Sequence, residues 1–371
     1  KFCGVLFAGI LLFLFSGCEQ VVSIAGDRHA NPKESKKITA VKHYTVPDTI
    51  CIAAVGDIML GSSYPDSSKL PPDSAKKSFT RVIKYLGGAD VVFGNLEGTL
   101  LDSGSPASHK KKLETAYLFR MPTGYGKVLK DAGFNLVSLA NNHITDFDRK
   151  GYVSTAKTLK NNGIHYAGLE DYPATVFERN GIKYGFCAFA PNAHTLSLID
   201  IRNARHIIRD LKQKCDILIV SFHGGAEGPT YEHVPFKMES YMNGLRGDVH
   251  AFAHNAVDAG ADIVLGNGPH VSRAIEKYRG RLIAYSLGNF CTYKSVSVMG
   301  ACGMAPLLKA YLNKKGEFIS GNIIAFRQTH EQGLVRDNRN GAVKRMQELT
   351  EKDFPQSGLD IDDDGSIVND D

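Results

Sequence analysis

Short apolar runs alternate with amphipathic segments along most of this 371-residue chain, which leaves few folds open to it. The apolar runs are Ile50–Val55, Val91–Gly94, Leu136–Ala140, Tyr184–Ala190, Ile217–Phe222, Ile263–Gly266 and Leu282–Leu287. The amphipathic segments include Ser74–Leu86, Gly126–Ala132, Gly151–Asn161 and Asp248–Ala259. Strands that alternate with helices in this way indicate a layered α/β domain.

Nearly every apolar run ends in a small cluster of Gly, Asn, Asp, Glu or His. The clusters are Gly56–Gly61, Gly94–Gly98, Ala140–Asp146, Ser221–Glu227 and Gly266–Val271, the last followed by Glu276 and Tyr285–Phe290. In α/β folds the loops at the carboxyl ends of strands converge on one crevice. We therefore expect these polar residues to form a single site.

The side chains in these clusters are of the types that bind divalent metals. Carboxylate oxygen, Asn oxygen and neutral imidazole suit Zn, Mn, Fe or Mg. Two metals about 4 Å apart can clamp a substrate oxygen and activate water at neutral pH. Each cluster alone is weak evidence, because a Gly-Asp pair is usually a turn, Asn-Asn-His can cap a helix, and a lone buried His is usually a hydrogen-bonded core residue. The prediction rests on the order of the clusters.

The motifs GDIMLG, GNLEG, ANNHITD, SFHGGAE, GNGPHV and YSLGNF, in this order over about residues 50 to 292, resemble the CapA-type family of capsule-synthesis (poly-γ-glutamate biosynthesis) proteins. The resemblance implies a calcineurin-like metallophosphoesterase fold for a domain spanning residues 48–330. This fold is a four-layer αββα sandwich, with two sheets covered by helices on both outer faces. The resemblance also implies a role in making or exporting a surface polymer.

Roles for individual residues follow from the same resemblance. The implied metal ligands are Asp57, Asn95, Glu97, Asn142, His223 and His270. The implied catalytic residues are His143, Asp146 and Glu227. His143 would steady a substrate oxyanion or act as an acid, and Asp146 can orient its imidazole. The implied cofactor is one or two divalent ions of Zn, Mn or Fe.

Two positions depart from the family pattern. Met59 stands where a phosphoesterase has a histidine two residues after its first aspartate, and Gly268 stands where many family members carry a second histidine. Both changes remove nitrogen ligands, although Asn267 can offer an amide oxygen. A single metal, or a loosely held pair, therefore fits the sequence better than full two-metal occupancy.

The amino-terminal segment predicts an exported lipoprotein. An apolar stretch, Gly4–Phe15, has the length of a signal-peptide core and is too short to span a bilayer. It leads to Ser16-Gly17-Cys18, which predicts a signal peptide over residues 1–17 and lipidation of Cys18. The alternative is an ordinary secretory signal whose cysteine is incidental. The polar residues that follow, 18–47, read as a flexible tether, so the protein would be membrane-anchored and face the periplasm or cell surface.

The net charge of +5 is spread along the chain without a long basic run, so we expect no nucleic-acid partner. Residues 331–371 are predicted to form a carboxyl-terminal helix, Ala342–Leu349, followed by an acidic hairpin. The run Asp360–Ile367 also resembles the start of a calcium loop. The alternative is a β-hairpin that turns at Asp363-Asp364-Gly365.

Three functions remain open from the sequence. The first is a metal-dependent hydrolase or transferase that acts on a phosphorylated or γ-glutamyl substrate. The second is a non-catalytic component that binds an anionic surface polymer or other capsule-synthesis proteins. A plain nucleotide or general phosphomonoester phosphatase is disfavoured, because Met59 replaces the histidine on which such enzymes rely.

Overall fold

The computed structural model describes residues 49–111 and 117–369. The predicted signal peptide (1–17), the predicted lipidation site Cys18 and the predicted tether (18–47) lie outside the described residues. Among the helices of the described residues, none combines the length and the apolar character needed to cross a membrane.

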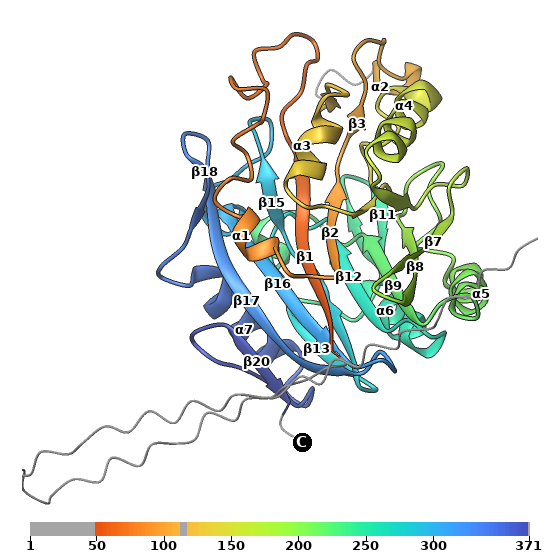
Figure 1. Cartoon of the computed structure of the whole chain (residues 1–371), viewed down its shortest axis with the longest axis vertical. Coiled ribbons are helices and arrows are strands. Elements are labelled where there is room, and N and C mark those ends of the chain that lie inside the picture. Colours follow the sequence, from red (N-terminus) through yellow and green to blue (C-terminus); the bar gives the residue numbers. More distant parts are fainter. Residues whose placement is uncertain (1–48, 112–116, 370–371) are drawn as a thin grey trace, which may run out of the picture. The chain divides into compact units, whose positions relative to one another are not determined.

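The first sheet has ten strands, with a parallel half and an antiparallel half (Figure 1). Its main order is β19-β20-β17-β16-β1-β2-β5-β6, while β15 pairs with β1 and β18 pairs with β17. The parallel strands are β1 (Ile50–Met59), β2 (Val91–Leu96), β5 (Leu136–Ser138), β6 (His165–Ala167) and β15 (Asn289–Thr292). The antiparallel strands are β16 (Met304–Leu312), β17 (Phe318–Thr329), β18 (Gly333–Arg336), β19 (Leu359–Ile361) and β20 (Ser366–Asn369).

The second sheet has six strands in the order β13-β14-β12-β9-β8-β7. Its four central strands are parallel, namely β8 (Ile182–Phe189), β9 (Ile217–His223), β12 (Ile263–Asn267) and β14 (Arg281–Ala284). Antiparallel strands close its edges, namely β7 (Ala174–Arg179) and β13 (Ile275–Tyr278). Two small ribbons are separate from both sheets, β3 (Thr99–Leu100) with β4 (Arg120–Met121) and β10 (Glu239–Tyr241) with β11 (Gly244–Gly247).

The alternation of side chains along β1 shows how the layers form. Ile52 and Ala54 lie in the core between the sheets together with Ile219 of β9. Ala53 and Val55 point the other way and pack with the outer helices of the first sheet. Because successive side chains of a strand point to opposite faces, an almost continuous apolar run is needed where both faces are covered.

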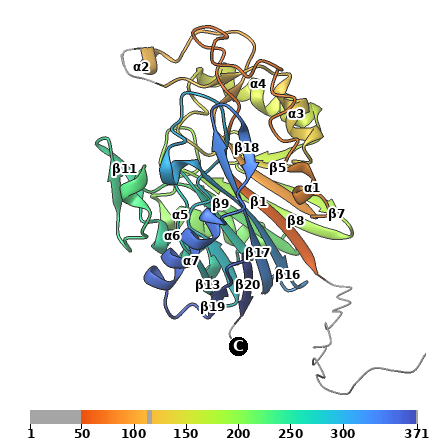
Figure 2. The ribbon, with the colours of Figure 1, turned by 90° about the vertical axis from the view of Figure 1, so that its left-hand side faces the viewer.

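Helices cover the outer face of each sheet (Figure 2). Those on the first sheet are α1 (Ile83–Leu86), α3 (Tyr125–Asp131) and α4 (Asp148–Asn161). Those on the second are α5 (Ile201–Lys212) and α6 (Val249–Asp258). The remaining helices are α2 (Ser108–Lys111), α7 (Gly341–Asp353) and the short 3₁₀ turns η1 (Pro229–Tyr231) and η2 (Gly300–Gly303). The predicted four-layer αββα sandwich is confirmed.

The carboxyl-terminal residues join the same sandwich. Helix α7 packs into the core between the sheets, and β20 pairs with β17. The hairpin alternative is confirmed, because β19 and β20 pair around a turn in which Gly365 N donates to Asp362 O at 2.8 Å. Strands therefore flank the acidic turn, whereas an EF-hand calcium loop needs a helix on each side.

Candidate metal centre

The carboxyl ends of strands from both sheets carry polar side chains toward one place. Asp57 near the end of β1 lies between Asn95 of β2 and Asn289 of β15, its partners in parallel pairing. In the second sheet, His223 at the end of β9 pairs with Asn267 at the end of β12. Sequence-distant residues are thus adjacent because parallel strands end at the same edge.

Gly56 allows β1 to come this close to the strand that ends in the YSLGNF motif. A Cβ at this position would clash with the carbonyl oxygens of Leu287 and Gly288. The neighbouring Asp57 N donates to Gly288 O at 2.8 Å. A larger residue at 56 would therefore push Asp57 away from Asn289.

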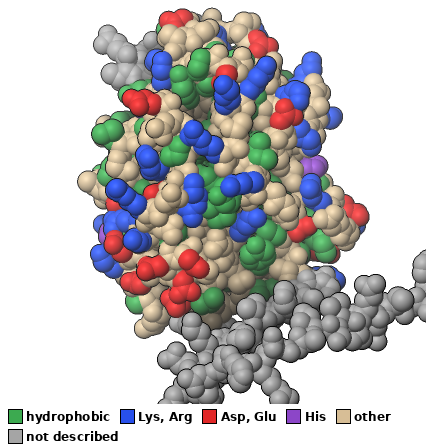
Figure 3. All heavy atoms as spheres, turned by 60° about the vertical axis from the view of Figure 1, so that its left-hand side comes forward, with side chains coloured by type: hydrophobic (Ala, Val, Ile, Leu, Met, Phe, Trp, Pro, Cys, Tyr) green, Lys and Arg blue, Asp and Glu red, His purple; other side chains and the backbone are tan. Residues whose placement is uncertain are grey.

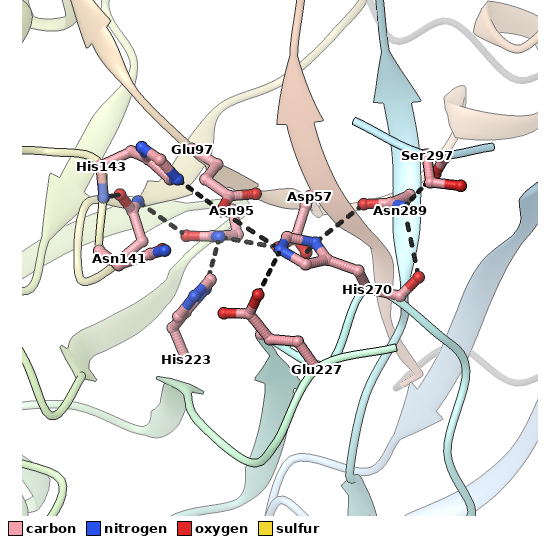
Figure 4. Close-up of polar contacts among 12 residues, drawn as sticks. Asp57, Asn95, Glu97, Asn141, His143, His223, Glu227, His270, Asn289 and Ser297 are labelled. Atoms are coloured by element: carbon pink, nitrogen blue, oxygen red, sulfur yellow. Dashed lines mark hydrogen bonds and ion pairs between the residues drawn. The ribbon is translucent and has the colours of Figure 1, made fainter. Parts of the chain in front are cut away.

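Two buried carboxylates and two imidazoles form the centre of the site (Figure 4). His270 Nδ1 lies 3.0 Å from Asp57 Oδ2, and His270 Nε2 lies 3.7 Å from Glu97 Oε1. His143 Nε2 approaches the same Glu97 oxygen at 3.9 Å. Asp57 and Glu97 are fully buried. Asp57, Glu97 and His270 each offer a ligand atom within 4.8 Å of the others, as a metal site requires.

A chain of amides connects Asp57 to His223. Asn95 Nδ2 donates to Asp57 Oδ1 at 2.8 Å and lies 3.2 Å from His223 Nδ1. Asn95 Oδ1 accepts from Asn141 Nδ2 at 3.3 Å. Asn141 also donates to Leu96 O at 2.9 Å. In this arrangement the Asn95 amide holds the neighbouring side chains in place.

The two asparagines of the ANNHITD motif have different surroundings. Asn141, to which the sequence analysis gave no role, is fully buried and bonded to Asn95. Asn142, predicted as a ligand, accepts from Lys110 Nζ at 3.3 Å through its backbone oxygen. Its side-chain oxygen is buried without a hydrogen-bond partner among the described residues. Of the two, Asn141 is the one in hydrogen-bond contact with the cluster.

Asp146 holds the His143 imidazole from behind. Its Oδ2 lies 2.9 Å from His143 Nδ1 and accepts from Phe119 N at 2.8 Å, while its Oδ1 pairs with Lys110 Nζ at 3.0 Å. The ring of Phe119 packs on the imidazole with centroids 4.1 Å apart. These contacts leave His143 Nε2 facing Glu97.

Glu227 faces the cluster from the loop after β9. Its Oε2 lies 4.0 Å from His270 Nε2, and its Oε1 pairs with Arg246 Nη2 at 3.0 Å. Arg246 comes from β11, which lies in no motif of the sequence, and its side chain is nearly buried. Its Nε donates to Gly225 O at 2.8 Å. Seven predicted residues are thus joined by close contacts in Figure 4, namely Asp57, Asn95, Glu97, His143, His223, Glu227 and His270.

The electrostatics of the site favour a bound cation. Burial raises the pKa of Glu97 to about 7, against the opposing effect of His270. Burial alone would lower the pKa of His270, but Glu97 and Asp57 outweigh it and raise that pKa to about 10. Burial, with Arg246 and His270, holds the pKa of His223 well below its usual value, so His223 is a neutral imidazole. The carboxylates thus attract positive charge into the cluster.

Unsatisfied buried atoms show that the residues present fit a divalent metal. Both oxygens of Glu97 lack a hydrogen-bond donor among the described residues, as do the side-chain oxygens of Asn142 and Asn267. His223 Nε2 likewise has no hydrogen-bond partner among them. Buried polar atoms are nearly always satisfied, and oxygen and imidazole nitrogen are the ligands that these metals take.

The structure leaves no room for a side chain at Gly268. Its φ is +116°, and a Cβ there would lie 2.7 Å from both N and O of Gly224 and 3.3 Å from Arg246 Nη2. The Arg246 guanidinium therefore lies beside the position at which the family resemblance implies a second histidine. The other departure, Met59, is fully buried.

We expect Gly268→His to destabilise the protein without raising its metal content. A positive φ costs a non-glycine residue about 1–3 kcal/mol, and contact with Gly224 adds to this cost. Gly181 is a matched control, because its φ is also positive, at +77°, and nothing lies within 4 Å of its added Cβ. Gly268→His should lower the urea midpoint more than Gly181→His does. An equal loss in both variants, or a gain of bound metal at 268, would contradict this account.

The layers and the site define an αββα protein with a candidate metal centre at the strand ends of both sheets. The chain belongs to the family described as "Bacterial capsule synthesis protein PGA_cap", whose model matches residues 51–294. The resemblance to the CapA-type family is therefore confirmed.

Curated relatives include two capsule proteins. "Capsule biosynthesis protein CapA" of Bacillus anthracis is 28% identical over 279 residues, which cover 70% of this chain and 63% of the relative. "PGA biosynthesis protein CapA" of Bacillus subtilis (strain 168) is 29% identical over 269 residues, covering 67% of this chain and 65% of the relative. The chain thus spans slightly less than two thirds of the length of these relatives.

Solved structures with a distant likeness include a 5′-nucleotidase precursor and a purple acid phosphatase. The 5′-nucleotidase precursor of Thermus thermophilus matches with a TM-score of 0.42 and 13% identity, over 77% of this chain and 55% of that chain. Purple acid phosphatase PPD1 of yellow lupin (Lupinus luteus) matches with a TM-score of 0.37 and 11% identity, over 78% of this chain and 53% of that chain.

Proposed function

We propose that this protein acts at the bacterial surface in the synthesis or export of a capsule or poly-γ-glutamate-type polymer, through a metal-dependent hydrolase site. Its family membership supports the biological role. The chemical part of the proposal rests on the surroundings of Glu97. Its carboxylate is fully buried, and neither oxygen has a hydrogen-bond donor among the described residues. The imidazoles of His143 and His270 lie beside it.

The proposed ligands are Asp57, Glu97, His223 and His270, with one ion of Zn, Mn or Fe as the first expectation. When bound, such a metal supplies Lewis-acid polarisation of the substrate and activates water at neutral pH. The amide of Asn95 donates to Asp57 Oδ1 and so orients that ligand. Outer contacts of this kind fix the orientation of ligand side chains and tune their affinity for metal.

His143 is the proposed partner for the reacting group of the substrate. Its Nδ1 faces the Asp146 carboxylate, and its Nε2 faces the cluster. A histidine fixed in this way can donate a proton or steady a developing negative charge at Nε2. Lys110, paired with Asp146, moderates the negative charge behind the ring.

The substrate we propose is an anionic surface polymer or its phosphorylated or γ-glutamyl precursor. Arg246 contributes positive charge near the ligand residues. Other capsule-synthesis proteins are the proposed partners, and lipidated Cys18 is the proposed membrane attachment.

Elsewhere on the molecule, Lys and Arg side chains are spread among apolar and acidic ones on the face in Figure 3.

Metal content tests the proposed centre. We expect the purified chain to hold stoichiometric Zn, Mn or Fe by mass spectrometry, and Asp57→Ala/His223→Ala to hold one ion fewer per chain. His143→Ala should keep the metal but lose hydrolysis of phosphoesters or γ-glutamyl polymers by about 100-fold or more. A wild-type chain that stays metal-free even after reconstitution would overturn the proposal.

A second candidate is a non-catalytic component that holds polymer or a partner protein without needing metal binding or proton transfer at this cluster. The lack of a ligand side chain at Gly268 and Met59 favours it, as does the pairing of Glu227 with Arg246. Under this alternative, His143→Ala and Asp57→Ala leave polymer export unchanged. Loss of export in both variants, with unchanged protein level, would favour the hydrolase.

A further inference from the structure

A second group of metal-binding side chains lies on the outer side of the six-stranded sheet. His250 and His254 are four residues apart on α6, so both project from one face of the helix. Glu276 comes from β13, where its neighbour Ile275 points into the core between the sheets. Glu276 must therefore point outward, toward α6. A ligand atom from each of the three residues lies within 4.8 Å of the others.

The contacts of Glu276 prepare it as a ligand. His254 Nε2 lies 3.0 and 2.9 Å from its two oxygens, and Tyr285 OH donates to Oε2 at 2.7 Å. Ligand atoms at about 2.0–2.2 Å from a tetrahedral zinc lie about 3.3–3.6 Å apart. His254 and Glu276 therefore need to separate by only a few tenths of an ångström. Tyr285 is the kind of outer hydrogen-bond partner that orients a ligating carboxylate.

Aromatic rings hold both imidazoles in place. Tyr278 stacks on His254 with ring centroids 3.7 Å apart, and Phe236 packs edge-on to His250 at 4.4 Å. The two imidazoles lie 4.0 Å apart, centroid to centroid. Rings fixed by packing lose little freedom when they bind an ion, which favours affinity.

The surroundings also leave the group accessible. The His254 side chain is 23% exposed and that of Glu276 is 10% exposed, so an ion can enter from solvent and keep a water as its fourth ligand. Two imidazoles and one carboxylate form a ligand set typical of zinc with an open position. No residue of this group belongs to the cluster around Asp57.

We propose that His250, His254 and Glu276 form a second divalent metal site, of the Zn²⁺ class, that is independent of the strand-end centre. The competing explanation is a hydrogen-bonded group of His254, Glu276 and Tyr285 that only joins α6 to the sheet. His250 separates the two explanations, because its contacts here are with aromatic rings and its loss leaves the bonds of Glu276 intact.

Zinc titration of the full chain, by calorimetry and mass spectrometry, tests the proposal. Wild type is compared with His250→Ala, and Asp57→Ala is compared with the double variant Asp57→Ala/His250→Ala. The control is His206→Ala, which replaces an exposed histidine of α5. We expect His250→Ala to bind one Zn²⁺ fewer per chain in both backgrounds, with affinity at this site lower by more than the roughly 10–100-fold that loss of an outer-shell partner costs. His206→Ala should bind as wild type does.

Equal zinc binding by wild type and His250→Ala would overturn the proposal, and so would a loss confined to Asp57→Ala. If Asp57→Ala does not fold, the comparison in the wild-type background decides alone.

Discussion

Replacing Arg273 with methionine is expected to lower the free energy of unfolding by about 3–5 kcal/mol. The Arg273 guanidinium is fully buried and pairs with both oxygens of Glu239 at 2.8 Å. Removing one member of a buried pair leaves the other charge without compensation, and this dominates the loss. Urea denaturation of the purified variant measures it.

Two further variants separate the loss of a buried pair from a general effect of mutation. Glu239→Leu/Arg273→Met removes both charges, so it should be less destabilised than Arg273→Met alone. Arg149→Met breaks the largely exposed pair with Asp171 and should cost under about 1 kcal/mol. A loss for Arg273→Met no larger than that for Arg149→Met would contradict the prediction.

The same pair connects stability to the candidate site. Glu239 Oε2 accepts from Ala226 N at 2.9 Å, and Arg273 Nε donates to Tyr231 O at 2.8 Å. Both contacts hold the loop that carries Glu227. We therefore expect Arg273→Met to weaken metal retention as well as folding.

Most of the fold could be predicted because parallel, doubly covered strands have a strong pattern. The seven apolar runs correspond to β1, β2, β5, β8, β9, β12 and β14. The antiparallel strands β16 and β17 were not singled out. Partly exposed positions interrupt the buried run of β17, so its pattern differs from that of the central strands. Such strands are recognised through their partners, which a sequence does not display.

The expected helix over Ser74–Leu86 was mostly wrong. Only Ile83–Leu86 is helical, and turns precede it. Ser74 and Ala75 have positive φ values of 56° and 62°, which a right-handed helix does not contain. Tertiary contacts of buried Ala75 and Phe79 determine the path of this segment, and apolar spacing alone did not reveal it.

The site was predictable where residues follow strands and unpredictable where they do not. Asp57 and Glu97 come together because adjacent parallel strands end at one edge. The contact of Asn141 with Asn95 depends on the path of a turn, which spacing does not give. Arg246 reaches the site from a small ribbon with no recognisable motif. Asn289, in the quoted YSLGNF motif, approaches His270 Nδ1 at 3.0 Å, a contact visible only in three dimensions.

Glu97→Gln is expected to change stability in opposite directions with and without metal. In metal-free protein, the Glu97 pKa of about 7 is raised above its usual value near 4.5 by burial. An acid whose pKa is higher in the folded state favours folding while protonated, so its contribution is lost as pH rises between about 4.5 and about 7. The neutral amide avoids this loss. At pH 8 with EDTA, Glu97→Gln should therefore be more stable than wild type by about 1–3 kcal/mol.

With metal present, the order of stabilities should reverse. A ligand that binds only the folded state stabilises it in proportion to the logarithm of its concentration over Kd, and Glu97→Gln loses the charge that attracts the ion. Added Zn²⁺ or Mn²⁺ should raise the Tm of wild type by several degrees more than that of the variant. Exposed Glu178→Gln on β7 is the matched control and should follow wild type in both conditions.

The two outcomes are linked, because a buried carboxylate without donors is unfavourable in the empty protein for the same reason that it binds a cation. A variant less stable than wild type in EDTA would mean that protein groups, and not an ion, satisfy the charge of Glu97.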